Sequence, residues 1–400
     1  MDDLLDLETV HFDKCIEVFH RVLQKREESF EELASQCGII YSDIPLPSRI
    51  CIPNDIRIEY CNRMMSDGVQ VHVLTVIKRK GLDVFLLPVL SEALACVLTF
   101  CFRTRFAASR WLGHLDREGK LGMPMDPFVR IASVSAGPLY VRPLSPDSVN
   151  IRTISFEELM KALAGSGPKD FKKIMRTFRL YQLALLTYPI DLGLSYSLLV
   201  SSVDNLGCRI PGPGGKREKF VNFIEENLPQ SFWKDFDSRA WEEDRWLDSI
   251  TPWKHSIIDS YRERFEREGE KALQSMQKVL DMRIIERIKS AFRDKTELPM
   301  EEKRAYDHVL NHWYLYRVDM KLTLKELRPI LQQVYDEVRS AFFHGGRSPP
   351  ETAVDRYETA RLKPRIKADK SIEWQRDIPS FYAFERMVHD SVLGYVGSVV

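Results

Sequence analysis

The sequence predicts an α+β protein, in which a mixed α/β N-terminal domain is followed by an all-α domain with a helical insertion. Strand-like alternation is confined to the first 150 residues, and helical spacing of apolar residues dominates after about residue 155. The 400 residues exceed one ordinary hydrophobic core, so two domains are expected. The 44% hydrophobic and 29% charged residues are typical of a globular chain.

The N-terminal domain is expected to cover residues 1–150. Apolar residues have helical spacing in Asp13–Ser35. Strand patterns follow at Ile50–Tyr60 and from Val69 to Thr75, and two more short strands are expected within 127–144. This order of elements indicates an α+β domain.

The apolar run Val84–Phe102 is nearly long enough to span a membrane. It contains Pro88 and Glu92, so a buried core helix is the better interpretation. The acidic N-terminal residues lack the basic and apolar regions of a secretory signal. The seven cysteines are odd in number and form no C-x-x-C pair, which is typical of reduced structural thiols. We therefore expect a cytoplasmic protein without membrane contact.

The remaining chain is expected to be helical. Residues 151–168 are predicted to form a linker that begins as a short helix, and residues 169–400 the all-α domain, with an insertion at about 230–320. Pro189 ends the first long helix of this domain, and Asp191 is expected to cap the next one.

Two familiar binding motifs are incomplete. Segment 210–217 contains a Gly pair and a Lys, but it lacks the Gly and the Ser/Thr that a phosphate-binding loop requires, so a plain turn is preferred. His308 and His312 have a spacing that can clamp zinc, but no catalytic Glu or third ligand accompanies them. A zinc hydrolase built on these histidines is the weakest hypothesis, and we expect no metal and no cofactor.

A more informative constellation lies in 335–346, YDEVRSAFFHGG, where Arg339 and His344 are near the end of a helix. An Arg and a His at this spacing can simply stabilise a helix C-terminus before a Gly cap. Histidine can also transfer protons near neutral pH, and arginine supplies a permanent cation.

This segment resembles the signature of HEPN domains, specifically the Apea-like HEPN group, which has an Arg-(x)4–6-His motif. Ser340 and Gly345 match the small polar residue and the glycine of that motif. An earlier helix of the family usually ends in Ala-x-Glu-x-Leu, and this chain has Asp204 in place of the Glu. The resemblance covers about 169–228 and 324–400.

The resemblance implies a metal-independent endoribonuclease with Arg339 and His344 as catalytic residues. Ser340, Tyr335 and Asp204 are the expected supporting residues. Attack by the RNA 2′-hydroxyl would leave a 2′,3′-cyclic phosphate and a 5′-hydroxyl. The resemblance also implies a toxin or antiviral-defence effector, in which the N-terminal domain senses a trigger or a regulatory partner. The alternative is a non-catalytic HEPN module that binds RNA, a nucleotide or a protein.

Helix geometry favours a homodimer. Five positions along a regular helix rotate by about 140°, so Arg339 and His344 do not point the same way. A two-fold dimer places two copies of each residue in one cleft, which is also how HEPN domains usually assemble. Tyr335 is expected either to stack on an RNA base or to pack in the core.

The formal net charge is zero, with 58 Lys+Arg and 58 Asp+Glu, which excludes a uniformly basic protein. Local basic segments still flank the motif. Their side chains either contact RNA phosphates or are simply solvated at the surface. The candidate RNA-binding residues are Arg347, Lys363, Arg365, Lys367, Arg176 and Arg179.

Overall fold

The protein has an α+β fold in a computed structural model. The structure describes residues 2–24, 36–47, 49–53, 56–66, 69–78, 84–115, 121–122, 146–188, 190–207, 215–229, 324–340, 362–366, 372–376 and 378–399. The chain divides into two compact units. The larger unit comprises Met1–Leu228, Val334–Pro350 and Glu385–Val400, and the smaller unit comprises Pro229–Gln333 and Glu351–Phe384.

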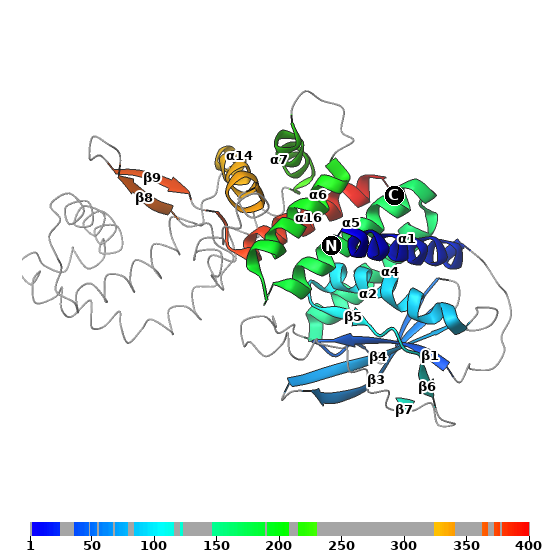
Figure 1. Ribbon diagram of the computed structural model, residues 1–400. Coiled ribbons are helices and arrows are strands. Elements are labelled where there is room, and N and C mark those ends of the chain that lie inside the picture. Colours follow the sequence, from blue (N-terminus) through cyan, green and yellow to red (C-terminus); the bar gives the residue numbers. More distant parts are fainter. Residues whose placement is uncertain are drawn as a thin grey trace, which may run out of the picture. The chain divides into compact units, whose positions relative to one another are not determined.

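An antiparallel sheet forms one layer of the larger unit (Figure 1). Its described strands are β1 (Gln36–Ser42), β2 (Arg49–Ile52), β3 (Ile56–Ser66), β4 (Val69–Lys78), β5 (Phe106–Ala108), β6 (Gly113–Leu115) and β7 (Leu121–Gly122). The strand order is β2-β3-β4-β1-β6-β7, and β5 also pairs with β1. In the register of the central pair, Ile39 of β1 lies opposite Thr75 of β4. The strands expected within 127–144 lie outside the described residues.

Strand β1 is central in the sheet and has no counterpart among the sequence-based expectations. All of its residues after Gln36 are buried, so its polar and apolar positions do not alternate in the way a half-exposed strand requires. Strands β3 and β4 confirm the expected strands at Ile50–Tyr60 and from Val69, although β2 accounts for the start of the first run.

Helices cover one face of this sheet (Figure 1). They are α1 (Asp2–Gln24), α2 (Leu87–Phe102), which follows the short helix η1 (Val84–Leu86), α4 (Pro146–Gly165) and α5 (Pro168–Thr187). Helix α2 contacts β1, β4 and β5 on one side and α1, α4 and α5 on the other. A helix between two layers is apolar nearly all round, which explains the run from Val84 and confirms the core-helix prediction. Among the described residues, no helix is long and apolar enough to cross a membrane.

The sheet and the first long helices belong to one compact unit, so the expected boundary between residues 150 and 169 does not separate two units. Most of the predicted 151–168 linker is helix α4, which extends to Gly165. Phe156, Met160 and Leu163 of this helix are buried. Packing of this apolar face stabilises the helix, as for most helices in proteins.

Further helices pack beyond α5 in the larger unit: α6 (Leu192–Gly207), α7 (Lys216–Asn227), the π-helical segment η3 (Val334–Ser340) and most of α16 (Phe381–Val399). Helix α6 contacts α5, α7 and η3. The backbone N–H of Leu194 donates to Asp191 Oδ1 at 2.9 Å, which confirms the predicted cap of α6.

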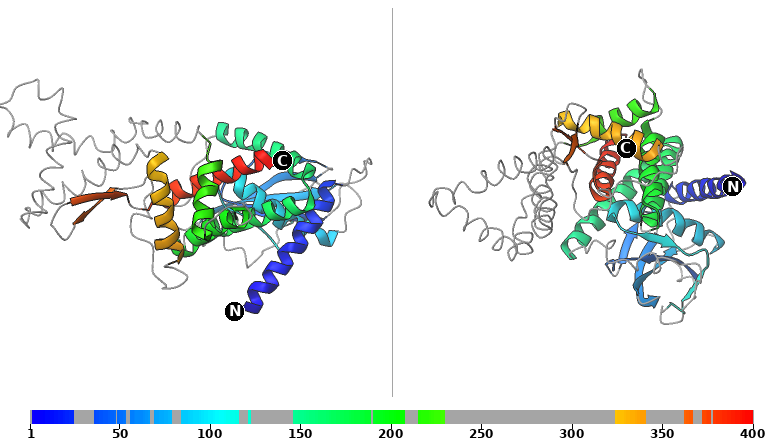
Figure 2. Two further views of the ribbon diagram at one scale, coloured as in Figure 1. Left: turned by 90° about the horizontal axis from the view of Figure 1, so that it is seen from above. Right: turned by 60° about the vertical axis from the view of Figure 1, so that its left-hand side comes forward.

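A buried ion pair attaches α16 to the end of α2. Arg103 Nε donates to Glu385 Oε1 at 2.9 Å, and the Tyr181 hydroxyl of α5 donates to the same carboxylate. Arg103 has a left-handed backbone, with φ of 50°, at the C-cap of α2. The chain turns sharply at Arg103, and this turn directs the arginine side chain toward Glu385. Figure 2 shows α5 and α16 side by side.

Helices α7 and α16 approach closely at Gly394. A Cβ atom at this position would overlap the carbonyl oxygen of Asn227, so no larger residue fits without movement of a backbone. On the same helix, a Cβ atom at Gly397 would meet no atom within 4 Å. The two glycines of α16 therefore have different packing constraints.

The described part of the smaller unit includes helix α14 (Leu324–Gln333) and a hairpin of β8 (Leu362–Ile366) and β9 (Ile372–Arg376). This hairpin corrects the expectation that residues 169–400 are all-α. Its short strands lie in a basic stretch, where charged residues conceal the apolar alternation on which a strand prediction depends. The expected insertion at 230–320 lies outside the described residues.

The described cysteines are free, as expected for reduced structural thiols. Burial raises the pKa of both Cys37 and Cys96 to about 12. Such thiols remain protonated near neutral pH and react slowly, because the thiolate is the nucleophile.

Candidate functional site

The segment that carries the Arg-(x)4–6-His motif packs against α6 through Arg339 and Asp204. Arg339 Nη2 lies 3.5 Å from Asp204 Oδ2. The side chains of Arg339 and Asp204 are 21% and 12% exposed, so the pair lies at the edge of the interior and still reaches solvent. The structure therefore brings together two residues that the sequence analysis selected from distant helices.

Aromatic packing fixes the position of Arg339. Its guanidinium carbon lies 4.8 Å from the centre of the Tyr335 ring, and that ring lies 5.6 Å from the ring of Phe220 on α7. Tyr335 is 6% exposed. It therefore packs in the core beneath the guanidinium, which leaves little of its ring for a base to stack on.

The environment of Asp204 shifts its proton affinity. Burial raises the pKa of this carboxyl to about 6, although the nearby charges of Arg339 and Lys216 act in the opposite direction. A carboxyl with a strongly shifted pKa beside a specific charged partner is a feature that functional sites often show.

A second ion pair lies at the surface of the same region. Arg217 Nη1 of α7 donates to Asp336 Oδ2 of η3 at 2.8 Å, and both side chains are about half exposed. Helix α7 thus contributes two cations near η3, Lys216 and Arg217, beside the motif arginine. Cations and carboxylates thus alternate around η3, and Arg217 lies close to the carboxylates of Asp336 and Glu218.

Several expected site residues lie outside the described residues or lack a described side chain. His344, Gly345, Arg347 and Lys367 lie outside them, and the side chain of Ser340 at the end of η3 is not described. The backbones of Lys363 and Arg365 belong to β8, where they pair with Gln375 and Glu373 of β9. His308 and His312, for which zinc binding is the weakest hypothesis, also lie outside the described residues.

Two expected RNA contacts are instead engaged within the larger unit. Arg176 of α5 donates to both carboxylate oxygens of Asp13 on α1, at 2.9 and 2.5 Å. Arg179 lies 3.0 Å from Glu92 of α2. These cations connect α5 to α1 and α2, because a partly buried carboxylate on each neighbouring helix attracts them. Their sequence neighbourhood is basic, but their partners are set by the tertiary structure.

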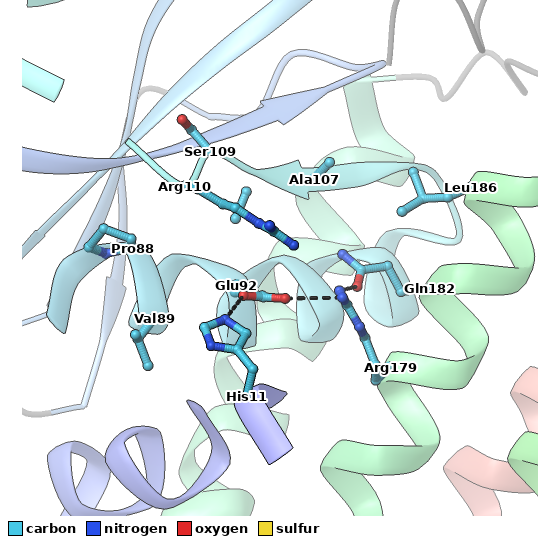
Figure 3. A pocket seen from close by; sticks show the side chains of 11 residues that line it. His11, Pro88, Val89, Glu92, Ala107, Ser109, Arg110, Arg179, Gln182 and Leu186 are labelled. Carbon is cyan, nitrogen blue, oxygen red and sulfur yellow. Dashed lines mark hydrogen bonds and ion pairs between the residues drawn. The ribbon is translucent and has the colours of Figure 1, made fainter. Parts of the chain in front are cut away.

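A pocket of about 450 Å³ lies beside Arg179 and was not predicted from the sequence. Figure 3 shows His11 of α1 and Arg179 of α5 reaching the carboxylate of Glu92 on α2 from two sides. Ser109 and Arg110, which follow β5, also line it. The sequence contained one signal for this site: His11 and Cys15 are four residues apart, and residues at this spacing share a helix face.

The arrangement around Arg339 is suited to holding an anionic oxygen near a cation whose position is fixed by a carboxylate and an aromatic ring. The pocket beside Glu92 combines imidazole, carboxylate and guanidinium groups and is suited to a small polar ligand or a metal. No protein-family model matches the chain, and no curated protein or solved structure matches it either.

Proposed function

We propose that this protein is a metal-independent endoribonuclease of the HEPN type, with Arg339 and His344 as its catalytic residues. The observation that supports this most is the contact between Asp204 and Arg339. Arg339 belongs to the motif that carries the resemblance, and Asp204 lies where an earlier helix of the family usually has Glu. Although Asp204 replaces the family's Glu, its contact with Arg339 still gives the motif arginine an acidic partner.

The reaction assigns distinct roles to the two catalytic side chains. A histidine of the site accepts the proton of the 2′-hydroxyl while the 2′-oxygen attacks phosphorus, and a second histidine donates a proton to the departing 5′-oxygen. Arg339 stabilises the negative charge that develops on the phosphoryl oxygens. The bond to the 5′-oxygen breaks as the bond to the 2′-oxygen forms, which leaves a 2′,3′-cyclic phosphate and a 5′-hydroxyl.

Asp204 and Tyr335 are positioning residues in this proposal. The carboxylate of Asp204 limits the rotation of the guanidinium, and the ring of Tyr335 supports one of its faces. A preorganised cation stabilises a transition state better than a flexible one, because less reorganisation accompanies the reaction. The π-helical backbone of η3 is consistent with a functional segment, since π-helical turns frequently occur at such sites.

Two histidines are supplied by a homodimer. Each protomer contributes one copy of Arg339 and His344 to a shared cleft, where one imidazole acts as base and the other as acid. RNA is the partner. Arg347, Lys363, Arg365 and Lys367, which follow the motif in the sequence, are its candidate phosphate contacts. The biological role as a toxin or antiviral-defence effector, controlled by the N-terminal region, follows from the resemblance alone.

The test is RNA cleavage by the purified full-length chain in the presence of EDTA, with detection of 2′,3′-cyclic phosphate ends. Arg339→Ala and His344→Ala are each expected to reduce cleavage by at least about 100-fold. Arg217→Ala is the matched control, because Arg217 is a nearby exposed arginine with a carboxylate partner. Circular dichroism and size-exclusion chromatography check that the variants remain folded dimers. Full activity in both catalytic variants would refute the proposal.

A non-catalytic HEPN binding module is the second candidate. The observation in its favour is that Asp204 and Tyr335 already engage the Arg339 guanidinium, as a purely structural arginine would also be engaged. Turnover distinguishes the two functions, because both allow RNA to bind. Protein that binds RNA and never releases cyclic-phosphate ends supports the module.

A further inference from the structure

The pocket beside α2 lies in the larger unit and has no role in the proposed cleavage reaction. Its walls come from α1, α2, β5, the segment after β5, and α5 (Figure 3). His11 and Glu92 line the pocket, and Cys15 lies next to them, one helical turn after His11. Cys15 is fully buried, and His11 is about half exposed.

Three potential metal donors converge at this place: His11 Nε2, Cys15 Sγ and Glu92 Oε2. The imidazole nitrogen lies 3.0 Å from the carboxylate oxygen and 3.7 Å from the sulfur, and the sulfur lies 3.8 Å from the same oxygen. Tetrahedral zinc with ordinary bond lengths to N, O and S requires donor–donor separations of about 3.3–3.7 Å. Shifts of a few tenths of an ångström would therefore convert this cluster into a coordination sphere.

The same geometry argues against a Cys-His-Glu catalytic relay. In such a relay, the nucleophile and the carboxylate contact opposite nitrogens of the imidazole. Here Cys15 and Glu92 both approach Nε2 of His11. Cys15 is also fully buried, so a substrate does not reach its sulfur. Three donors that face one point are the arrangement of a ligand set.

The second oxygen of Glu92 is held by a separate residue. Glu92 Oε1 lies 3.0 Å from Arg179 Nη2, and Arg179 Nη1 donates to Gln182 Oε1 at 2.9 Å. The Arg179 guanidinium also lies over the Phe12 ring, with 5.0 Å between its carbon and the ring centre. Metal-binding carboxylates usually have such an outer hydrogen-bond partner, which orients the coordinating oxygen. Oε2 is thereby directed toward His11 and Cys15.

We propose that His11, Cys15 and Glu92 bind a zinc ion at this pocket. Imidazole, thiolate and carboxylate donors together are typical of zinc, and three protein ligands leave a fourth position for an oxygen ligand. A thiolate and a carboxylate balance the charge of Zn²⁺, and the side chains of Arg110 and Arg179 also line the pocket. The fourth ligand is therefore water or an anionic oxygen of a small molecule. This site is independent of Arg339 and of RNA cleavage.

The test uses the purified full-length chain after removal of metal with a chelator. Titration calorimetry with Zn²⁺ is expected to show one site, and Co²⁺ is expected to give the absorption of a four-coordinate ion with a thiolate-to-metal charge-transfer band. His11→Ala and Cys15→Ser are each expected to weaken binding by more than about 100-fold, and Arg179→Met, which removes an outer partner, by about 10-fold. The Cys15 variant is also expected to lose the charge-transfer band.

The matched controls are Cys51→Ser and His114→Ala, which change an exposed cysteine and an exposed histidine of the sheet. They are expected to retain the site and its spectrum. Because His11 is half exposed, His11→Ala is expected to keep the fold even if Cys15→Ser does not, and circular dichroism checks both. Absence of a stoichiometric site in the wild-type chain, or a folded His11→Ala variant that binds Zn²⁺ as tightly as the wild type, would overturn the proposal. Since metal binding is measured directly, neither result depends on ribonuclease activity.

Discussion

The carboxylate of Asp204 on α6 lies 3.5 Å from the guanidinium of Arg339 on η3, and this contact joins two helices that are far apart in the chain. The pair is nearly buried on the Asp204 side and more exposed on the Arg339 side. Such a contact limits the orientations that the arginine side chain can adopt. The stability of the protein also depends on whether the Asp204 carboxyl is protonated.

Asp204 gives a testable pH dependence. Its pKa is raised from 3.8 to about 6 in the folded protein, so the folded state binds more protons than the unfolded state between these values. Above pH 6, Asp204 is ionised and its burial lowers the free energy of unfolding. This destabilisation decreases as the pH falls. Relative to Asp204→Asn, the wild type should gain roughly 1.5 kcal/mol in free energy of unfolding between pH 7.5 and pH 5.

Urea unfolding of both proteins at the two pH values measures this difference. Asp336→Asn serves as the control, because Asp336 is about half exposed on the neighbouring segment. A stability difference between wild type and Asp204→Asn that does not change with pH would show that Asp204 has an ordinary pKa.

The second prediction concerns the shape of the motif cation. Arg339→Lys retains the positive charge but loses the planar guanidinium that rests on Tyr335 and faces Asp204. If Arg339 stabilises the phosphoryl oxygens through this planar group, kcat for RNA cleavage should fall by about 100-fold in the lysine variant. Arg217→Lys should change kcat little. Equal kcat values for Arg339→Lys and the wild type would mean that a point charge is sufficient.

The third prediction concerns the buried carboxylate of Glu385. Burial tends to raise its pKa, but Arg103, His389 and the Tyr181 hydroxyl hold the pKa below its ordinary value. Glu385→Ala leaves the buried Arg103 guanidinium without this carboxylate and should lower the free energy of unfolding by about 3–5 kcal/mol at neutral pH. Denaturant unfolding measures the loss.

The sign of the pH effect provides a further check on Glu385. A carboxyl with a lowered pKa stabilises the folded protein above its unfolded pKa, and this stabilisation is lost as the solution is acidified. The wild type and Glu385→Ala should therefore converge in stability at low pH. Asp336→Ala, which breaks an exposed ion pair, should have little effect at any pH. If Glu385→Ala and Asp336→Ala lowered the free energy of unfolding by similar amounts, burial of the Glu385 ion pair would not explain its contribution to stability.

The fourth prediction separates two glycines of α16. Gly394→Ala should destabilise the protein by about 1–3 kcal/mol, because its Cβ atom would overlap the backbone of α7 at Asn227. Gly397→Ala should be neutral or stabilising by up to about 1 kcal/mol, because the added methyl group meets no atom within 4 Å and alanine favours a helix. Thermal unfolding of the two variants compares them directly. Equal melting temperatures would show that α7 and α16 are not closely packed.

Local patterns in the sequence were sufficient to predict several elements. The apolar run from Val84 identified a core helix, because a helix covered on all sides carries few polar residues. Asp191 identified the start of α6 through a hydrogen bond within one helical turn. Strand β1 was not predicted, since its buried residues lack alternation, and the β8–β9 hairpin was concealed by charged residues.

The sequence by itself indicated which residues have suitable chemistry at the motif: an arginine, a histidine and an acidic residue at position 204. It did not single out His11 and Cys15, because the helical spacing was recognised only from Asp13 onward. Only the tertiary structure decided which of these groups meet. It placed Asp204 beside Arg339, Arg179 beside Glu92, and Glu92 beside His11 and Cys15. The physical reason is that ion pairs and ligand clusters depend on separations of a few ångströms between side chains. These separations are set by the packing of whole helices, on which the local pattern around any one residue carries no information.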